Sequence, residues 1–408
     1  MEHLQISQFL GMLVVMLGVA KAGGYLVQRV GQPAVMGELI GGVLVGKSVL
    51  GWVNPEYETI HLLSELGVVI LLFAIGLETD FGQLVRVGPT SLAVAVVGVA
   101  LPFALGFAAC RLLGLTMLVS IMAGATLTAT SVGITARVLS DLGRLRDPEG
   151  QIILGAAVID DVLGLLILTV VAELALGREV SVMGVVKTTA SAVGFLLATI
   201  LVGKLAVPPL FRWAGRMELP GTPTALALIA AFGLAWLADQ CGSATIIGAF
   251  AAGLVVVAAP QAHEIERGIT QIGHFFVPLF FVVVGASVDV STLDPSKPSS
   301  RFALAIGGVL IVAGAAGKLA SGYAPFWYRG NKTVIGVGMI PRGEVGLIFA
   351  QTGLASGVFD AGLFGGVTLM VVVTTLMAPP LLKLLLGPAP EPDLQLDADG
   401  IEDLVAEA

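Results

Sequence analysis

The feature that most constrains the fold is a series of apolar segments, each about long enough to cross a lipid bilayer. A transmembrane helix needs about 17–25 predominantly apolar residues. Thirteen such segments follow one another along the 408-residue chain, at residues 6–27, 34–50, 60–78, 88–110, 114–138, 150–174, 181–204, 222–239, 243–259, 269–288, 302–325, 333–354 and 361–386. The connections between them are short. The sequence therefore predicts an all-α polytopic membrane protein with thirteen transmembrane helices.

Composition supports this fold class and argues against a soluble globular protein. Hydrophobic residues make up 56% of the chain and charged residues only 12%, whereas soluble domains carry about 25% charged residues. The 53 glycines suit helix packing in lipid, where small residues let backbones approach closely. The two cysteines form neither a disulfide framework nor a metal site. We expect no cofactor and no nucleic-acid partner.

The positions of Lys and Arg predict the orientation, since cytoplasmic loops of membrane proteins carry an excess of them. With the N-terminus outside, five basic residues lie on the outer side: Lys47, Arg111, Arg178, Lys297 and Arg301. Twelve lie on the inner side: Arg29, Arg86, Arg137, Arg144, Arg146, Lys204, Arg212, Arg216, Arg267, Arg329, Lys332 and Lys383. The C-terminus then lies in the cytoplasm, and the expected location is the plasma (inner) membrane.

The chain is expected to form one membrane unit with an acidic tail. The N-terminal apolar run follows no basic region, so we expect a retained first helix rather than a signal peptide. Residues 1–387 make up the transmembrane unit. Residues 388–408 carry seven acids and no base, which predicts a disordered cytoplasmic tail.

Two stretches of the first half recur in the second half at an offset near 210 residues. "PAVMGELIGGVLVG" resembles "ATIIGAFAAGLVVV", so that Gly37 matches Gly248 and Gly42 matches Gly253. "LLFAIGLETD" resembles "FFVVVGASVD", so that Gly76 matches Gly285. The offset is seven helices, an odd number, so the second copy enters the membrane upside down. The pattern predicts an inverted-topology repeat, typical of secondary transporters. The repeats cover about residues 6–174 and 222–386, and a helix at about 181–204 links them.

Two of the predicted helices carry signs of interruption. The segment at 114–138 contains a cluster of hydroxyl residues that includes Thr130 and Ser131. The segment at 333–354 contains Pro341 and Gly343, and proline breaks or kinks a helix. Such hydroxyls also occur as ordinary hydrogen-bonding groups between helices. As a matched pair, the two segments predict discontinuous helices that cross near the middle of the membrane.

Two adjacent carboxylates, Asp160 and Asp161, lie in the apolar segment at 150–174. A charge at bilayer depth costs about 2.5–3.5 kcal/mol even on the gentlest scales. Side chains of neighbouring helical residues point about 100° apart, so the two cannot face the same partner. Lys318 lies in another apolar segment, and we expect it to pair with one of the aspartates. The alternative is that Lys318 extends to the inner membrane surface.

Other charged residues in apolar segments are expected to be mainly structural. Arg342 and Glu344 flank the predicted break at Pro341. They either compensate each other's charge or shape the potential of the cavity. Glu38, Glu65 and Glu78 lie in or at the ends of apolar segments, and we interpret them as structural groups.

A carboxylate pair in a dry cavity suits ion exchange. Burial disfavours the charged form of a carboxylate, so such a group holds either a proton or a cation. Carboxylate, hydroxyl and carbonyl oxygens are ligands for hard cations. Competition of cation and proton at one site that opens alternately to each side is antiport. An intramembrane aspartyl protease is disfavoured, because adjacent aspartates on one helix diverge. A channel is disfavoured because no filter-like loop is present.

With these residues, the chain resembles the monovalent cation:proton antiporter superfamily, in its second branch. It is similar to the bacterial sodium/proton antiporters of the NapA kind. The motifs that carry the resemblance are "QPAVMGELIGGVLVG", "LLFAIGLETD", "TATSVGITARVL", "ILGAAVIDDVLGL", "AGKLASG" and "GMIPRGEVGLI". The resemblance covers about residues 10–386, and the paired aspartates are its most specific element.

The resemblance implies a function and a role for each residue. The protein would be a sodium or lithium/proton antiporter, not an enzyme. It would be electrogenic and would work as a homodimer with a core domain and a dimer domain that move in an elevator-like way. Asp161 would bind the ion and the proton, and Asp160 would release Lys318 as the cation binds. Thr130 and Ser131 would lie at the first crossing helix, and Arg342 and Glu344 at the second. Potassium/proton antiport and sodium-coupled symport of an organic anion remain alternatives.

Overall fold

The chain folds into an all-helical bundle. The computed structural model describes residues 5–175, 182–214, 216, 219, 221–288, 290 and 298–387. Over these residues every regular element is a helix. The predicted acidic tail, residues 388–408, lies outside the described residues.

Fifteen helices occupy the thirteen predicted segments. They are α1 (Ile6–Arg29), α2 (Ala34–Val45), α3 (Glu58–Glu78), α4 (Phe81–Leu112), α5 (Met117–Thr126), α6 (Val132–Asp141), α7 (Pro148–Ala175), α8 (Val182–Ala214), α9 (Thr222–Gln240), α10 (Thr245–Val256), α11 (Ala262–Ala286), α12 (Pro298–Ser321), α13 (Lys332–Gly338), α14 (Glu344–Ala355) and α15 (Ala361–Leu386). The segments at 114–138 and 333–354 are each broken in two, as their Thr/Ser and Pro/Gly content predicts. Within the described part, nine helices are long and apolar enough to cross a membrane.

The helices α2 and α10 are shorter than their predicted segments. Each has 12 residues, where the sequence predicts 17, and so extends only about 18 Å. The apolar sequence continues beyond the last residue of each helix, but the helical conformation of the backbone does not. Gly46 ends α2 in an extended conformation, and a turn that includes Pro260 follows α10.

A capping group lengthens α4 beyond its apolar segment. Asp80 precedes the helix, and its carboxylate accepts hydrogen bonds from the main-chain N–H groups of Gly82, at 2.7 Å, and Gln83, at 3.1 Å. These bonds satisfy donors that the first turn leaves unpaired. The helix therefore begins seven residues before the predicted start at residue 88.

The glycines that match between the two halves also contact each other in matching pairs. A Cβ atom on Gly42 of α2 would lie only 3.0 Å from the Cα atom of Gly285 in α11. A Cβ atom on Gly253 of α10 would lie 2.6 Å from the Cα atom of Gly76 in α3. Gly42 corresponds to Gly253 and Gly285 to Gly76 in the sequence repeat, so the same close helix crossing occurs twice.

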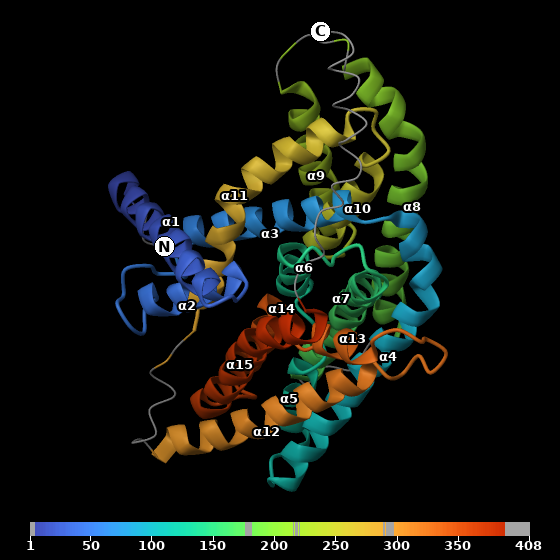
Figure 1. Cartoon of the computed structure of the whole chain (residues 1–408). Coiled ribbons are helices and arrows are strands. Elements are labelled where there is room, and N and C mark those ends of the chain that lie inside the picture. The colour runs from blue at the N-terminus through green and yellow to red at the C-terminus, as the bar shows by residue number, and fades with distance from the viewer. Residues whose placement is uncertain are drawn as a thin grey trace.

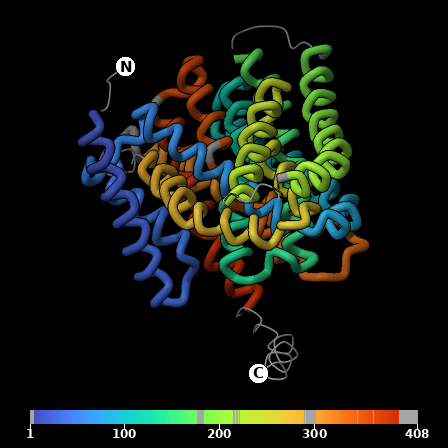
Figure 2. Tube along the Cα trace, turned by 90° about the horizontal axis from the view of Figure 1, so that it is seen from above, coloured from blue at the N-terminus to red at the C-terminus, as the bar shows by residue number. Residues whose placement is uncertain are grey.

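The contacts divide the helices into two groups (Figure 1). The first helix group contains α1–α3 and α8–α11, and the second contains α4–α7 and α12–α15. Corresponding helices pack alike: α2 on α1 and α11, α10 on α9 and α3, α7 on α4, and α15 on α12. Between the groups, contacts are sparse and involve α6 with α2 and α3, α15 with α2, and α7 with α8. In Figure 2, α1 and α2 lie at one edge of the molecule and α8 at the opposite edge.

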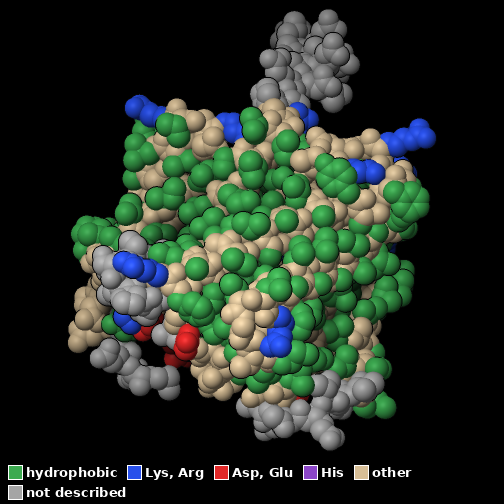
Figure 3. All heavy atoms as spheres, turned by 90° about the horizontal axis from the view of Figure 1, so that it is seen from below, with side chains coloured by type: hydrophobic (Ala, Val, Ile, Leu, Met, Phe, Trp, Pro, Cys, Tyr) green, Lys and Arg blue, Asp and Glu red, His purple; other side chains and the backbone are tan. Residues whose placement is uncertain are grey.

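The outer surface of the bundle is apolar. Figure 3 shows one face covered mainly by hydrophobic side chains, with Lys and Arg at its rims. Large apolar side chains such as Ile6, Val14, Leu205 and Ile229 are more than half exposed. Lipid is the solvent that makes such a surface favourable.

Candidate functional site

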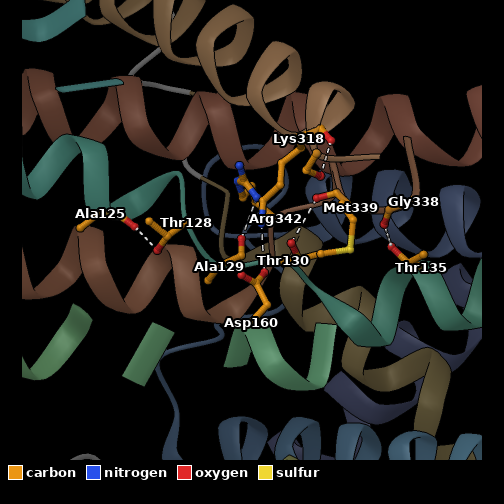
Figure 4. A network of polar contacts seen from close by, with 11 residues as sticks. Ala125, Thr128, Ala129, Thr130, Thr135, Asp160, Lys318, Gly338, Met339 and Arg342 are labelled. Atoms are coloured by element: carbon orange, nitrogen blue, oxygen red, sulfur yellow. Dashed lines mark hydrogen bonds and ion pairs between the residues drawn. The ribbon is translucent and has the colours of Figure 1, made fainter. Parts of the chain in front are cut away.

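The two broken helices meet at their breaks, in the interior of the second helix group. The main-chain N–H of Ser131 donates a hydrogen bond to the carbonyl oxygen of Pro341, at 2.9 Å. The hydroxyl of Thr130 donates to the carbonyl of Met339, at 3.2 Å, and the hydroxyl of Thr135 to that of Gly338, at 2.7 Å. Figure 4 shows the two side-chain bonds. Each break therefore satisfies polar backbone groups of the other.

The local sequence accounts for both breaks. Pro341 has no N–H group and cannot continue the hydrogen-bond ladder of α13. At Gly343 a Cβ atom would lie 2.5 Å from the Ser131 hydroxyl oxygen, so only glycine permits this close approach. On the other chain segment, the hydroxyl of Thr128 donates to the carbonyl of Ala125, at 2.7 Å. Such bonds from Thr to its own helix end favour termination over continuation.

The breaks bring four helix ends to one place. The C-terminal ends of α5 and α13 and the N-terminal ends of α6 and α14 all lie at the crossing. Helix N-termini carry about half a positive charge and C-termini about half a negative charge. The crossing therefore presents carbonyl oxygens and partial charges of both signs inside a dry protein interior.

Asp160, on α7, forms an ion pair with Lys318 of α12. Its Oδ2 atom lies 3.0 Å from the Lys318 ammonium, and both side chains are completely buried. The sequence predicts such a pair for one of the two aspartates, and the geometry selects Asp160 (Figure 4). The other oxygen, Oδ1, accepts no hydrogen bond from any residue that the structure describes. Asp160 thus has capacity for a further cationic or donor group.

Asp161 is also buried, with 5% of its surface exposed. It follows Asp160 on α7 and points to a different side of that helix, because successive side chains are about 100° apart. Helix α7 packs against α4, α5, α6, α13 and α14. Both carboxylates therefore lie on a helix that contacts the helices before and after each of the two breaks.

Arg342 ties the second break to the first. Its side chain is fully buried, and Nη1 donates to the carbonyl oxygen of Ala129, at 2.9 Å. The main-chain carbonyl of Arg342 accepts a hydrogen bond from the hydroxyl of Thr375 in α15. Its Nε and Nη2 atoms donate no hydrogen bond to the described residues. Arg342 lies within electrostatic reach of Asp160, so two cationic side chains act on this carboxylate.

The structure describes the side chain of Ser131 but not that of Glu344, the two remaining predicted site residues. Ser131 precedes α6, and its buried hydroxyl makes no hydrogen bond within the described part of the chain. Glu344 begins α14, but its side chain lies outside the described residues. A direct Arg342–Glu344 pair therefore stays a prediction. Sequence reasoning missed Thr375, although the dipeptide Thr374–Thr375 in an apolar segment is a signal that could have found it.

The arrangement offers hard oxygen ligands next to fixed positive charges. Carboxylates, hydroxyls and main-chain carbonyls bind small hard cations. Among the described residues, no three His, Cys, Asp or Glu side chains group in a way that could hold a metal ion. Oxygen ligands of this kind can bind a monovalent cation, and a carboxylate can hold a proton instead.

Comparisons with known proteins identify relatives over nearly the whole chain. The family described as sodium/hydrogen exchanger, transmembrane, matches residues 13–386. The high-affinity Na(+)/H(+) antiporter NhaS3 of Synechocystis sp. is 42% identical, over 91% of this chain and 88% of its own. The Na(+)/H(+)-K(+) antiporter GerN of Bacillus cereus is 35% identical, over 93% of this chain and 97% of its own.

The fold also matches that of a solved structure. The sodium proton antiporter MjNhaP1 from Methanocaldococcus jannaschii superposes with a TM-score of 0.67. The match covers 93% of this chain and 97% of that chain at 16% identity, so it concerns the fold alone. Sequence and fold agree: the chain is a multi-pass membrane protein that belongs to the sodium/hydrogen exchanger family, within the monovalent cation:proton antiporters.

Proposed function

We propose that this protein is a secondary active sodium/proton antiporter that exchanges cation and protons at Asp160 and Asp161. Membership of a family of transporters and the printed activities of the relatives NhaS3 and GerN support antiport. The observation that carries the assignment to these residues is the fully buried Asp160–Lys318 pair, at 3.0 Å, with Asp161 beside it. The protein would act as a carrier and not as an enzyme.

The exchange follows from charge balance at the site. In the cation-free state, Asp161 holds a proton and Asp160 is neutralised by Lys318. When sodium or lithium binds, Asp161 releases its proton and Asp160 turns from Lys318 to the cation. Lys318, left without its partner in a dry environment, gives up a proton as well. One cation enters the site while two protons leave it, so each cycle moves a net charge and the exchange is electrogenic.

The hydroxyls at the crossing would complete the cation site. Thr130 uses its hydrogen to bond the Met339 carbonyl, which leaves oxygen lone pairs available for a cation. Ser131 has a buried hydroxyl that the described residues leave without a bond. Arg342 would hold the crossing in place and keep the site from binding two cations at once. Glu344 would adjust the potential at the cavity.

Alternating access would come from movement of one helix group past the other. The sparse contacts between the two groups support an elevator-like motion in which the second group carries the site. The first group would be the dimer domain and the second the core domain, and α8 would link two inverted repeats. A homodimer through α1 and α9, an outside N-terminus and an inner-membrane location complete the proposal.

Potassium is the leading alternative substrate. The name of GerN includes potassium, and oxygen ligands alone do not select an ionic radius. Sodium-coupled symport of an organic anion is a further alternative, but two cavities of the described part, one among α2, α11, α14 and α15 and one among α4, α5 and α7, are lined mainly by apolar side chains and give it no support.

The test uses proteoliposomes with an acidic interior and a trapped pH indicator. External sodium or lithium should raise the internal pH with wild-type protein and fail to do so with Asp161→Asn. Asp239→Asn, an exposed change on α9, is the control and should behave as wild type. A response to potassium alone would show that the exchanged cation is potassium rather than sodium. No response of folded protein to any cation would refute antiport.

A further inference from the structure

Another buried carboxylate besides Asp160 and Asp161, that of Glu38, lies where the two helix groups meet. It belongs to α2 of the first group and is only 4% exposed. The helix α2 contacts α6 of the second group, and the charged groups whose fields reach Glu38 are Arg137 and Asp141 of α6 and Lys21 of α1. The proposed ion site adjoins the N-terminal end of α6, at Thr130 and Ser131, whereas Glu38 is influenced by Arg137 and Asp141 farther along this helix.

Both cations near Glu38 are engaged with other partners. Arg137 lies 3.0 Å from Asp141 on its own helix. The Lys21 ammonium donates to the carbonyl oxygen of His274 in α11, at 3.3 Å. The Oε2 atom of Glu38 accepts no hydrogen bond from the residues described. A buried carboxylate without a bonded donor is costly in its charged form, so this arrangement suits a protonated Glu38.

Partly exposed charged side chains lie near Glu38. The side chains of Arg137 and Asp141, whose fields reach Glu38, are 21% and 23% exposed. Glu78, at the end of α3, lies in the same interface and accepts a hydrogen bond from Ser140 of α6, at 3.4 Å. Charged and polar side chains therefore lie where α6 contacts α2 and α3, and Glu38 is buried in α2.

Helix α6 connects this contact to the crossing. It begins after Ser131, whose N–H bonds the carbonyl of Pro341, and ends at Asp141. Ten residues of helix form a rigid rod about 15 Å long. A change in the fit of α6 against α2 therefore also shifts one side of the crossing.

We propose that Glu38 is a proton-operated switch at the interface between the two helix groups. Its neutral form fits the closed contact between α2 and α6, and loss of its proton drives the contact apart. In the separated state water reaches the carboxylate, which favours the charged form. The closed contact therefore binds one more proton than the open one, so acid favours closure and alkali favours opening. This inference rests on the proposed movement of the two groups, and it adds the group that sets the working pH.

The test measures the contact directly, apart from transport. Spin labels are placed on full-length protein in lipid nanodiscs at Ile40→Cys in α2 and Leu92→Cys in α4, with Cys110 and Cys241 replaced by serine. Wild-type protein should show two distance populations whose ratio changes with pH, by at most about tenfold per pH unit for a single linked proton. Glu38→Gln keeps the neutral form and should hold one population, with less than about a twofold change over the same range.

Two further variants make the result specific. Glu65→Gln, on α3 of the same helix group and 61% exposed, should retain the wild-type pH dependence. Arg137→Gln removes the positive charge near Glu38 and should move the midpoint to higher pH, which tests the switch if Glu38→Gln fails to fold. Wild-type pH dependence in Glu38→Gln, or an unmoved midpoint in Arg137→Gln, would overturn the proposal. Absence of sodium transport by wild type would refute antiport and leave this distance measurement standing.

Discussion

The Lys318 ammonium lies 3.0 Å from the Asp160 carboxylate, and neither side chain has any exposed surface. Each charge makes the other tolerable in the dry interior. Loss of one partner leaves an unpaired buried charge, which costs about 3–5 kcal/mol. Loss of both partners together leaves neither charge of this pair uncompensated.

The pair therefore predicts non-additive effects on stability. Asp160→Asn and Lys318→Gln should each lower the melting temperature in detergent strongly, and the double variant should be more stable than at least one of them. Thermal unfolding at one fixed pH, with the four proteins compared, measures the coupling. Additive losses in the double variant would show that the pair does not act as a unit.

The same pair predicts the charge moved per cycle. Lys318→Gln removes one of the two protons that the proposed cycle exchanges for each cation. It should reduce the transport current on a supported membrane by about tenfold or more while sodium flux, measured with a tracer, falls less. Current and flux that fall in the same proportion would argue against a proton carried by Lys318.

Arg342 predicts a structural role at the crossing. Its bond to the Ala129 carbonyl links the two breaks, so Arg342→Gln should loosen residues 127–131. Hydrogen exchange of this loop should rise by about tenfold for each 1.4 kcal/mol lost. Arg267→Gln, an exposed change on α11, is the matched control. Equal protection in Arg342→Gln and wild type would contradict the assigned role.

The glycine crossings predict a position-specific loss of stability. In Gly253→Ala the new methyl group would meet the Cα atom of Gly76 at 2.6 Å, and overpacking of this kind costs about 1–3 kcal/mol. Gly233→Ala, where no atom lies within 4 Å, should be neutral or stabilising, since alanine favours helix. Equal melting temperatures for the two variants would show that α3 and α10 do not cross as closely as described.

Much of the helix arrangement could be predicted from sequence. Helices occur in each of the apolar segments, although only nine of those in the described part are long and apolar enough to cross a membrane. The Thr/Ser and Pro/Gly content of two segments predicted their breaks. The exact ends of the helices could not be predicted from apolar length, because they depend on capping residues. The Asp80 cap lengthens α4, and Gly46 shortens α2, although neither changes the apolar pattern.

The site could be predicted only where side-chain charge gave the signal. A charge in an apolar segment needs a partner, which led from Asp160 to Lys318. The contacts of Arg342 with the Ala129 carbonyl and with Thr375 could not be found in this way. They involve main-chain groups and a distant helix, and backbone carbonyls carry no sequence signature. The environment of Glu38 was missed for the same reason, since it depends on how α2 meets α6.

Competition between sodium and protons at one site is the central claim, and proton release on sodium binding tests it most directly. Sodium is added to purified protein in weakly buffered detergent solution, and the protons released are measured with a pH indicator. Wild-type protein should acidify the solution in proportion to the sodium bound, and Asp161→Asn should release fewer protons or none. Sodium binding with no release of protons would contradict the account.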